Sequence, residues 1–324
     1  MIYRRLGSTG LHLSALSFGS WITFGKQIDE STAEQLMHYA YEHGVNFFDN
    51  AEAYENGESE RLMGNVLARS NWPRENWCVS SKVFWGAQKT PTSKGLSRKH
   101  IIEACHAALK RLQVDYLDLY FCHRPDAQAP ISETVEAMSD LIRQGKVLYW
   151  GTSEWSAAEI MAARYEAAKH HLYEPVMEQP QYNMFARQRV EKEYRRIFDD
   201  YGMGTTIWSP MAGGKLSGKY LKEDSGPSRK DVMGKSWVRN QLEGETFKRE
   251  AAVLKELQKM ADELGITLAR LSLAWCLSNP DVSTAILGAS RVSQLEENLQ
   301  AVDDLSLITP EIKSQIDRIL AAHL

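Results

Sequence analysis

The chain has 324 residues, 43% of them apolar and 25% charged, which is the composition of a soluble globular protein and a length that suits an α/β barrel with insertions. Its net charge of −4 argues against nucleic acid as a partner, and the lack of any apolar run near ~18 residues argues against direct insertion into a membrane. The four cysteines are widely spaced without a CxxC pair, and the first residues lack the apolar core of a signal peptide, so we expect a metal-free protein of the cytoplasm.

The first half of the chain alternates between strand-like and helix-like segments. It opens with a predicted hairpin over residues 3–14, whose strands flank the turn Gly7-Ser8-Thr9-Gly10. Ser31, with Glu34 three residues later, predicts the capped start of the first helix. Short apolar runs predict strands at residues 16–19, 45–48, 78–81 and 117–122, and apolar periodicity predicts helices at about 31–43, from about 59, at 98–112 and at 131–143.

The second half continues the alternation and contains one long connection. Strands are predicted at residues 147–151, 176–179, 205–208 and 284–287, and helices from a cap at Ser156 and at 247–264, 268–277, 293–302 and 310–320. The segment from about 209 to 245 is rich in Gly, Lys and Ser and is predicted to be a lid or a binding loop.

Eight strand-plus-helix units after a hairpin, with no break in composition, predict one closed parallel barrel. The expected fold is a (β/α)8 TIM barrel with an N-terminal β-hairpin and extra C-terminal helices, forming a single domain over residues 1–324. An open doubly wound sheet is the alternative. In a barrel of this kind the active site lies at the C-terminal ends of the strands.

Four residues that suit proton transfer follow three of the predicted strands: Asp49, Tyr54, Lys82 and His123. A phenol is a weak acid with a pKa of about 10, and a nearby ammonium favours its ionised form. A carboxylate beside the ammonium keeps that ammonium charged. Each residue alone has an ordinary explanation as a cap, a packing residue or a solvated side chain, but together at consecutive strand ends they predict a catalytic site.

Several segments resemble a known family. Phe47-Phe48-Asp49-Asn50-Ala51-Glu52-Ala53-Tyr54, Ser81-Lys82 and His123 are similar to the signature of aldo-keto reductases. The resemblance covers essentially the whole chain and is closest to the branch that contains the β subunits of voltage-gated potassium channels. The segments typical of that branch are 19–25, 95–103, 149–153 and 286–290.

The resemblance implies an NADPH-dependent reductase of aldehydes and some ketones. Hydride moves from the reduced nicotinamide to the carbonyl carbon while Tyr54 donates a proton to the oxygen. In this mechanism Lys82 lowers the pKa of Tyr54, Asp49 pairs with Lys82, and His123 orients the carbonyl through a hydrogen bond. The substrate is then a small carbonyl compound, and no metal is required.

The cofactor contacts are also implied by the resemblance, because no GxGxxG dinucleotide motif follows a strand. Ser153 and Gln179 are expected to hold the nicotinamide carboxamide, and Trp208 to stack on its ring. Further contacts are expected from Ser20, Trp21, Gln27 and Asp49 at the strand ends, Ser209, Pro210, Met211, Ala212, Gly213 and Lys219 at the pyrophosphate, Gly288, Ser290, Gln294 and Arg229 at the 2′-phosphate, and Glu297 and Asn298 at the adenine.

Charge and helix position favour NADPH over NADH. Gly288-Ala289-Ser290 opens a predicted helix, where backbone N–H groups suit an anion, and Lys219 and Arg229 add positive charge for an extra phosphate. Gly213, Gly218 and Lys219 also fit the start of the phosphate-binding loop of NTPases. Tyr220 follows where that loop needs Ser or Thr for magnesium, so ATP binding is disfavoured.

Two residues depart from the channel-subunit branch, and they leave two functions open. Glu154 stands where that branch often has Arg, and an acid there should weaken cofactor binding or point away from the cofactor. His123 replaces an Asn and favours turnover. The alternative function is that of an accessory β subunit of a membrane potassium channel with slow or vestigial chemistry. The start of the chain at the hairpin, without an N-terminal extension, favours the enzyme, and the branch suggests a homotetramer.

Aromatic residues after the first, third and fifth strands predict a substrate pocket. Trp21, Trp85 and Trp155 are expected to line it together with Tyr54 and His123, although ordinary packing would also explain the tryptophans. Nothing in the sequence selects one carbonyl compound.

Overall fold

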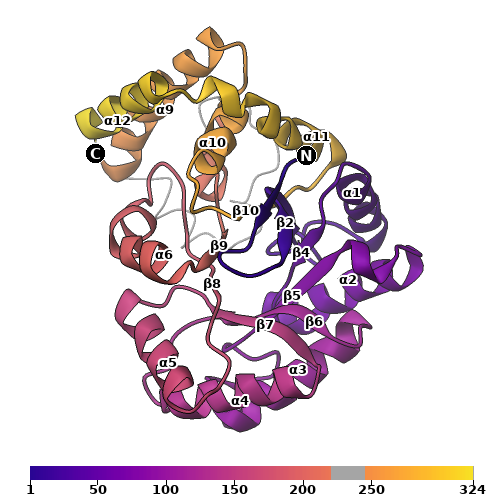
Figure 1. The fold of residues 1–324 in the computed structure, drawn as a ribbon. Helices are drawn as coiled ribbons and strands as arrows, with labels where there is room; N and C mark the ends of the chain where they lie inside the picture. The colour runs from indigo at the N-terminus through magenta and orange to yellow at the C-terminus, as the bar shows by residue number, and fades with distance from the viewer. Residues whose placement is uncertain (220–244, 324) are drawn as a thin grey trace.

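The computed structural model describes residues 1–219 and 245–323 and contains a closed parallel barrel of eight strands in the order β10-β3-β4-β5-β6-β7-β8-β9. Helices surround the barrel in Figure 1. The barrel confirms the predicted (β/α)8 fold and excludes the open sheet. A two-stranded antiparallel hairpin, β1 with β2, precedes it as predicted.

The strands are short, and their bounds follow the apolar runs of the sequence closely. The hairpin consists of β1 (Tyr3–Arg5) and β2 (His12–Ser14). The barrel strands are β3 (Leu16–Gly19), β4 (Phe47–Asp49), β5 (Cys78–Val83), β6 (Leu117–Cys122), β7 (Val147–Thr152), β8 (Met177–Glu178), β9 (Gly204–Ile207) and β10 (Thr284–Leu287).

The α-helices that surround the barrel are α1 (Glu30–Glu42), α2 (Glu58–Arg69), α3 (Arg98–Leu112), α4 (Ile131–Arg143), α5 (Ala157–Lys169), α6 (Arg195–Tyr201), α9 (Glu245–Glu263), α10 (Leu268–Leu277), α11 (Val292–Leu299) and α12 (Pro310–His323). In Figure 1, α9 and α12 lie together at the end of the chain, and they are in contact. None of the helices in the described ranges combines the length and the apolar character that a membrane span requires.

The apolar core has two parts, one on each side of the barrel wall. The larger part fills the space between the strands and the surrounding helices. The smaller part lies inside the barrel and includes Phe47, Leu119, Phe121 and Met177. Leu6 and Leu13 of the hairpin region belong to this inner cluster, so the hairpin packs against the interior of the barrel and leaves the opposite mouth for a site.

Parallel pairing brings the predicted site residues to that mouth. Gly19 of β3 pairs with Asp49 of β4, and Lys82 of β5 pairs with Phe121 of β6. His123 comes directly after β6. Because parallel strands end at the same rim, the residues at these strand ends lie close together.

Two details of the secondary structure differ from the sequence prediction. The first helix is capped by Asp29, whose side chain accepts a hydrogen bond from the N–H of Thr32, so the predicted cap at Ser31 is wrong. Both Asp and Ser are good caps, and the pattern did not separate them. The cap predicted at Ser156 is confirmed, with a capping box to Glu159.

The structure also contains helices that the sequence analysis did not anticipate between β8 and β9. A π-helical turn (Arg189–Glu193) leads into α6. Their short lengths give little periodic signal. Of the long predicted loop after β9, a 3₁₀ segment (Ala212–Ser217) is described, whereas residues 220–244 lie outside the described part.

Candidate active site

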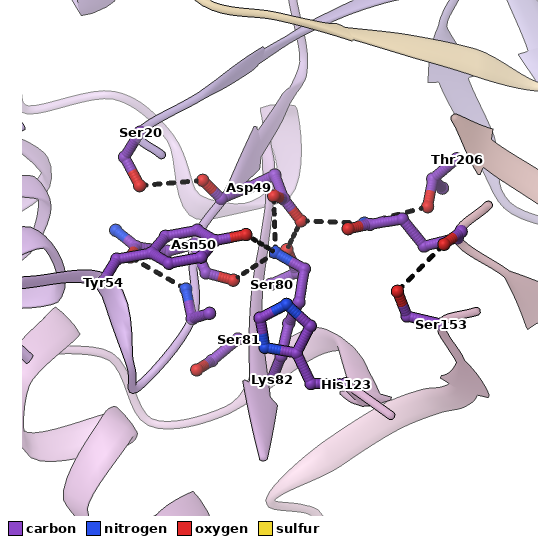
Figure 2. Close-up of polar contacts among 12 residues, drawn as sticks. Ser20, Asp49, Asn50, Tyr54, Ser80, Ser81, Lys82, His123, Ser153 and Thr206 are labelled. Atoms are coloured by element: carbon purple, nitrogen blue, oxygen red, sulfur yellow. Dashed lines mark hydrogen bonds and ion pairs between the residues drawn. The ribbon is translucent and has the colours of Figure 1, made fainter. Parts of the chain in front are cut away.

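Lys82 lies at the centre of the predicted catalytic group. Its ammonium donates to Asp49 Oδ2 at 2.6 Å, to the backbone oxygen of Asn50 at 2.7 Å and to the phenol oxygen of Tyr54 at 3.0 Å. These three bonds use all three hydrogens of an ammonium group. Figure 2 shows these groups gathered around the Lys82 nitrogen.

Asp49 anchors this ammonium from the end of β4. Besides Lys82, its carboxylate accepts hydrogen bonds from Ser80 Oγ at 2.8 Å and from Gln179 Nε2 at 3.1 Å. Burial alone would lower the pKa of Lys82, but the charge of Asp49 and its hydrogen bond contribute to a net rise. Lys82 therefore stays charged although its side chain is fully buried.

Tyr54 is held at the start of an unusual turn. The two residues that follow it, Glu55 and Asn56, have left-handed backbone with φ of 47° and 54°, and Gly57 continues with φ of 87°. Left-handed backbone at residues other than Gly costs free energy and is found most often where a side chain must be held in place. The turn directs the phenol toward Lys82, whose nitrogen lies 4.7 Å from the ring centroid.

The effect of Lys82 on Tyr54 corrects the simple expectation from the sequence. Burial raises the pKa of Tyr54, and the Asp49 charge adds to this effect, while Lys82 only partly offsets it. The pKa of the phenol is therefore raised overall instead of lowered, because desolvation of a buried phenolate outweighs one ammonium that is already paired with a carboxylate. Tyr54 is a neutral phenol in the protein at ordinary pH.

His123 faces Tyr54 across the same mouth. The centroids of the two rings are 5.9 Å apart and the ring planes meet at 76°. Burial lowers the pKa of His123 well below its ordinary value, and the charges of Lys82 and Arg124 lower it further, so the imidazole is neutral. Its Nδ1 is buried without a hydrogen-bond partner among the described residues. The catalytic group therefore contains a neutral imidazole with one ring nitrogen unused.

These residues line one end of a large cavity, called here the main cavity, with a volume of about 1160 Å³. Its lining contains most of the residues that were expected to bind the cofactor, namely Trp21, Gln27, Asp49, Ser153, Gln179, Trp208, Ser209, Pro210, Met211, Gly213, Lys219, Gly288, Ser290, Gln294, Glu297 and Asn298. The strand ends and the loop before α11 therefore share one continuous space.

Three of the expected cofactor residues do not line the main cavity as described. Ser20 is fully buried and donates to the backbone oxygen of Asp49 at 3.2 Å, so it supports the wall from behind. Ala212 is part of the 3₁₀ segment but is absent from the lining. Arg229 lies outside the described residues.

The expected substrate pocket needs one correction. Trp21, Tyr54, Trp85 and His123 line the main cavity. Trp155 does not, since it is 2% exposed and lines a separate cavity of about 220 Å³ near α4. The chain turns sharply at the preceding residue, whose φ is 59°, and this turn accounts for the different direction of the tryptophan.

Two cationic residues of the lining were not singled out from the sequence. Arg124 follows His123 and donates to the backbone oxygen of that residue and to Ser153 Oγ. Arg291 lies next to Ser290 at the other end of the cavity and is exposed. Each is adjacent to a residue that the resemblance did identify, and this adjacency was the available signal.

The sequence matches known proteins over nearly its whole length. The family model "Aldo/keto reductase family" matches residues 15–321. The chain belongs to the aldo/keto reductase family. It is 47% identical over 327 residues to a protein of Arabidopsis thaliana named "Probable voltage-gated potassium channel subunit beta", covering 99% of this chain and 97% of that protein. A protein of the same name from Oryza sativa subsp. japonica is 44% identical over 322 residues, with the same coverage.

Aldo/keto reductases generally use a nicotinamide dinucleotide, and the main cavity of this reductase suits such a molecule. Gln179 Nε2 donates to Asp49 and to Thr206 Oγ1 at 3.2 Å, so both amide hydrogens are used and the amide oxygen remains as an acceptor for a carboxamide. The far end of the lining carries Lys219, Ser290 and Arg291, whose ammonium, hydroxyl and guanidinium groups suit phosphate. The chemistry of the lining therefore fits both ends of the dinucleotide.

Proposed function

We propose that this protein is an NADPH-dependent reductase of aldehydes and some ketones, with Tyr54 as the proton donor. The observation that carries the proposal is the bond from Lys82 Nζ to the phenol oxygen of Tyr54 at 3.0 Å. Since the ammonium donates to that oxygen, the hydrogen of the phenol is left to donate elsewhere. A carbonyl oxygen at the mouth of the barrel is the acceptor that this arrangement suits.

In the proposed mechanism each residue has one task. Asp49 keeps Lys82 charged, and Lys82 stabilises the negative charge that develops on Tyr54 when its proton leaves. His123, which is neutral, donates one hydrogen bond to the carbonyl oxygen and orients it. A bound reduced nicotinamide supplies the hydride to the carbonyl carbon.

The proposed cofactor site extends along the main cavity. Ser153 and Gln179 would hold the carboxamide, and Trp208 would cover one face of the nicotinamide ring, leaving the other face for the substrate. Lys219 would lie near the pyrophosphate, and Ser290 with Gln294 near the 2′-phosphate. This last pair, together with Arg291, supports NADPH over NADH.

A second candidate function is supported by the two relatives. Both are named as probable β subunits of voltage-gated potassium channels. The protein would then bind the cofactor as an accessory subunit, as a homotetramer, with slow chemistry. The two functions share the same catalytic residues, and they differ in turnover rate.

Steady-state oxidation of NADPH across a panel of small aldehydes, ketones and quinones tests the first proposal. The reductase predicts turnover of roughly 1 s⁻¹ or faster with at least one aldehyde, a typical lower value for enzymes. Tight NADPH binding with no turnover across the panel would contradict it and favour the accessory subunit.

A further inference from the structure

Glu154 is an acidic residue beside the proposed cofactor site. It follows Ser153, and its sequence position raised the question of whether its charge opposes a polyanionic cofactor. Glu154 does not line the main cavity, although Ser153 and Trp208 on either side of it do. Its carboxylate is therefore turned away from the cavity and into the wall.

The carboxylate of Glu154 joins three segments behind that wall. Oε1 accepts from the backbone N–H of Gln181 at 2.6 Å and from the indole Nε1 of Trp208 at 2.9 Å. Oε2 accepts from Arg189 at 2.6 Å. The segments after β7, β8 and β9 are thereby held together by one side chain.

The backbone at Glu154 is arranged for this contact. Its φ of 59° is in the left-handed region, which is uncommon for residues other than Gly, Asn and Asp. Such backbone persists where the surrounding contacts hold it, and here three hydrogen bonds end on the same carboxylate. The turn and the contacts together fix the carboxylate against Trp208.

The orientation of Trp208 depends on few contacts. Its indole N–H is a donor only, and Glu154 is the acceptor that it uses. On the cavity side the ring meets Trp21 edge-on, with centroids 5.8 Å apart and planes at 90°. The side chain is only partly buried, so the hydrogen bond at one edge and Trp21 at the other determine the plane of the indole.

We propose that Glu154 is a positioning residue for the cofactor: it holds the indole of Trp208 in the plane that packs against the nicotinamide ring. This inference rests on the proposed function, because it assumes that NADPH binds with its nicotinamide ring at Trp208. The acid thus supports cofactor binding through a neighbouring ring, and its charge is satisfied by Arg189 and two N–H groups.

The test separates the two ends of the cofactor. Isothermal titration calorimetry measures the Kd of NADPH and of 2′,5′-ADP, which lacks the nicotinamide, for the wild type and for Glu154→Ala. We expect Glu154→Ala to raise the Kd of NADPH by about tenfold, the effect of losing one hydrogen bond to a charged group. The Kd of 2′,5′-ADP should stay within about twofold, since its contacts are distant and independent.

Two further variants guard against misfolding and against a simple effect of charge. Glu154→Asp keeps the charge and tolerates the left-handed backbone, but it is one methylene too short to bond all three partners, so it should show the same loss confined to NADPH. Arg189→Met removes the ion pair and leaves Oε1 with both of its donors. It should change neither Kd by more than about twofold.

A double-mutant cycle identifies Trp208 as the residue through which Glu154 acts. Trp208→Phe keeps a ring but removes the N–H that Glu154 accepts. In the Trp208→Phe background, Glu154→Ala should cause no further change in the ratio of the two Kd values. An additive loss in the double variant would overturn the proposal.

Two other outcomes would also overturn it, and they differ in meaning. If the wild type binds NADPH but Glu154→Ala and Glu154→Asp weaken NADPH and 2′,5′-ADP equally, Glu154 only supports the fold. If the wild type binds 2′,5′-ADP but gains nothing from the nicotinamide of NADPH, the proposed function fails together with this inference.

Discussion

The two ends of the main cavity are built by different means. At the catalytic end, Asp49, Lys82 and His123 are buried on strand ends, and Lys82 joins Asp49 and Tyr54 through direct hydrogen bonds. At the distal end, Ser290 and Arg291 are exposed on a loop. Ser290 donates to Gln294 Oε1 through its backbone N–H at 3.0 Å and through its hydroxyl at 3.1 Å.

This difference separates chemistry from recognition. Strand ends in a barrel are fixed by the register of the sheet, so groups placed there keep their geometry without help from a ligand. Loop residues are easily exchanged during evolution and suit the choice between related cofactors. Substitutions at the catalytic end should therefore change rates, and substitutions at the distal end should change the preference for a cofactor.

The largest effect is expected at the phenol. Tyr54→Phe removes the proton donor but leaves the ring, so kcat for aldehyde reduction should fall by about 10²- to 10⁴-fold, the usual contribution of a general acid. Fluorescence titration with NADPH should give a nearly unchanged Kd, since the phenol hydrogen is not a proposed cofactor contact. Wild-type turnover by this variant would remove Tyr54 from the role of proton donor.

Lys82→Met should affect both rate and stability. It leaves the buried Asp49 carboxylate without its ammonium, and breaking a buried ion pair costs about 3–5 kcal/mol of unfolding free energy. Urea denaturation measures that loss. The matched control is Lys26→Met, whose ion pair with Glu55 at 3.6 Å is exposed and should contribute under about 1 kcal/mol. Equal stability of the two variants would mean that the buried pair is not the anchor of the catalytic end.

The pH dependence of the rate tests the protonation states at the catalytic end. The pKa of Tyr54 is raised above its ordinary value, so the phenol keeps its proton up to at least about pH 10. The pKa of His123 is lowered well below its ordinary value, so the imidazole stays neutral down to about pH 6. The value of kcat for reduction should be flat between these limits. A fall in rate centred on neutral pH would show that one of the two groups titrates there.

The smallest effect is expected at the distal end. Arg291→Ala removes an exposed cation beside Ser290, so the Kd of NADPH should rise by about two- to fivefold while that of NADH stays unchanged. Arg229→Ala, at the position predicted from the sequence, is measured in the same way. Lys26→Ala removes a cation from the lining near Tyr54 and serves as the control. An equal rise for both cofactors would exclude the tested arginine from the 2′-phosphate site.

The sequence was sufficient for the barrel and for the residues at the catalytic end. Buried strands and capped helices have clear periodic patterns, and the helix over residues 98–112 begins and ends where the pattern predicted. Asp49, Lys82 and His123 come at the ends of such strands, so their convergence follows from the fold alone. Their geometry is a consequence of parallel register.

Features that depend on a single backbone turn could not be predicted. The left-handed φ at Glu154 sends Trp155 away from the main cavity and brings the carboxylate to Trp208, and no local pattern in the sequence indicates that conformation. The net shift of the Tyr54 pKa was also beyond the sequence. It depends on how completely the phenol is desolvated, which only the packed structure determines.

The most direct test of the central claim is a single-turnover experiment. The protein is loaded with less than one equivalent of NADPH and mixed with excess aldehyde in a stopped-flow instrument, and the fluorescence of NADPH is followed in the wild type and in Tyr54→Phe. We predict complete loss of the NADPH signal in one exponential phase for the wild type, and loss slower by about 10²-fold or more for the variant. Persistence of bound NADPH in the wild type, or equal rates in the two proteins, would contradict this account.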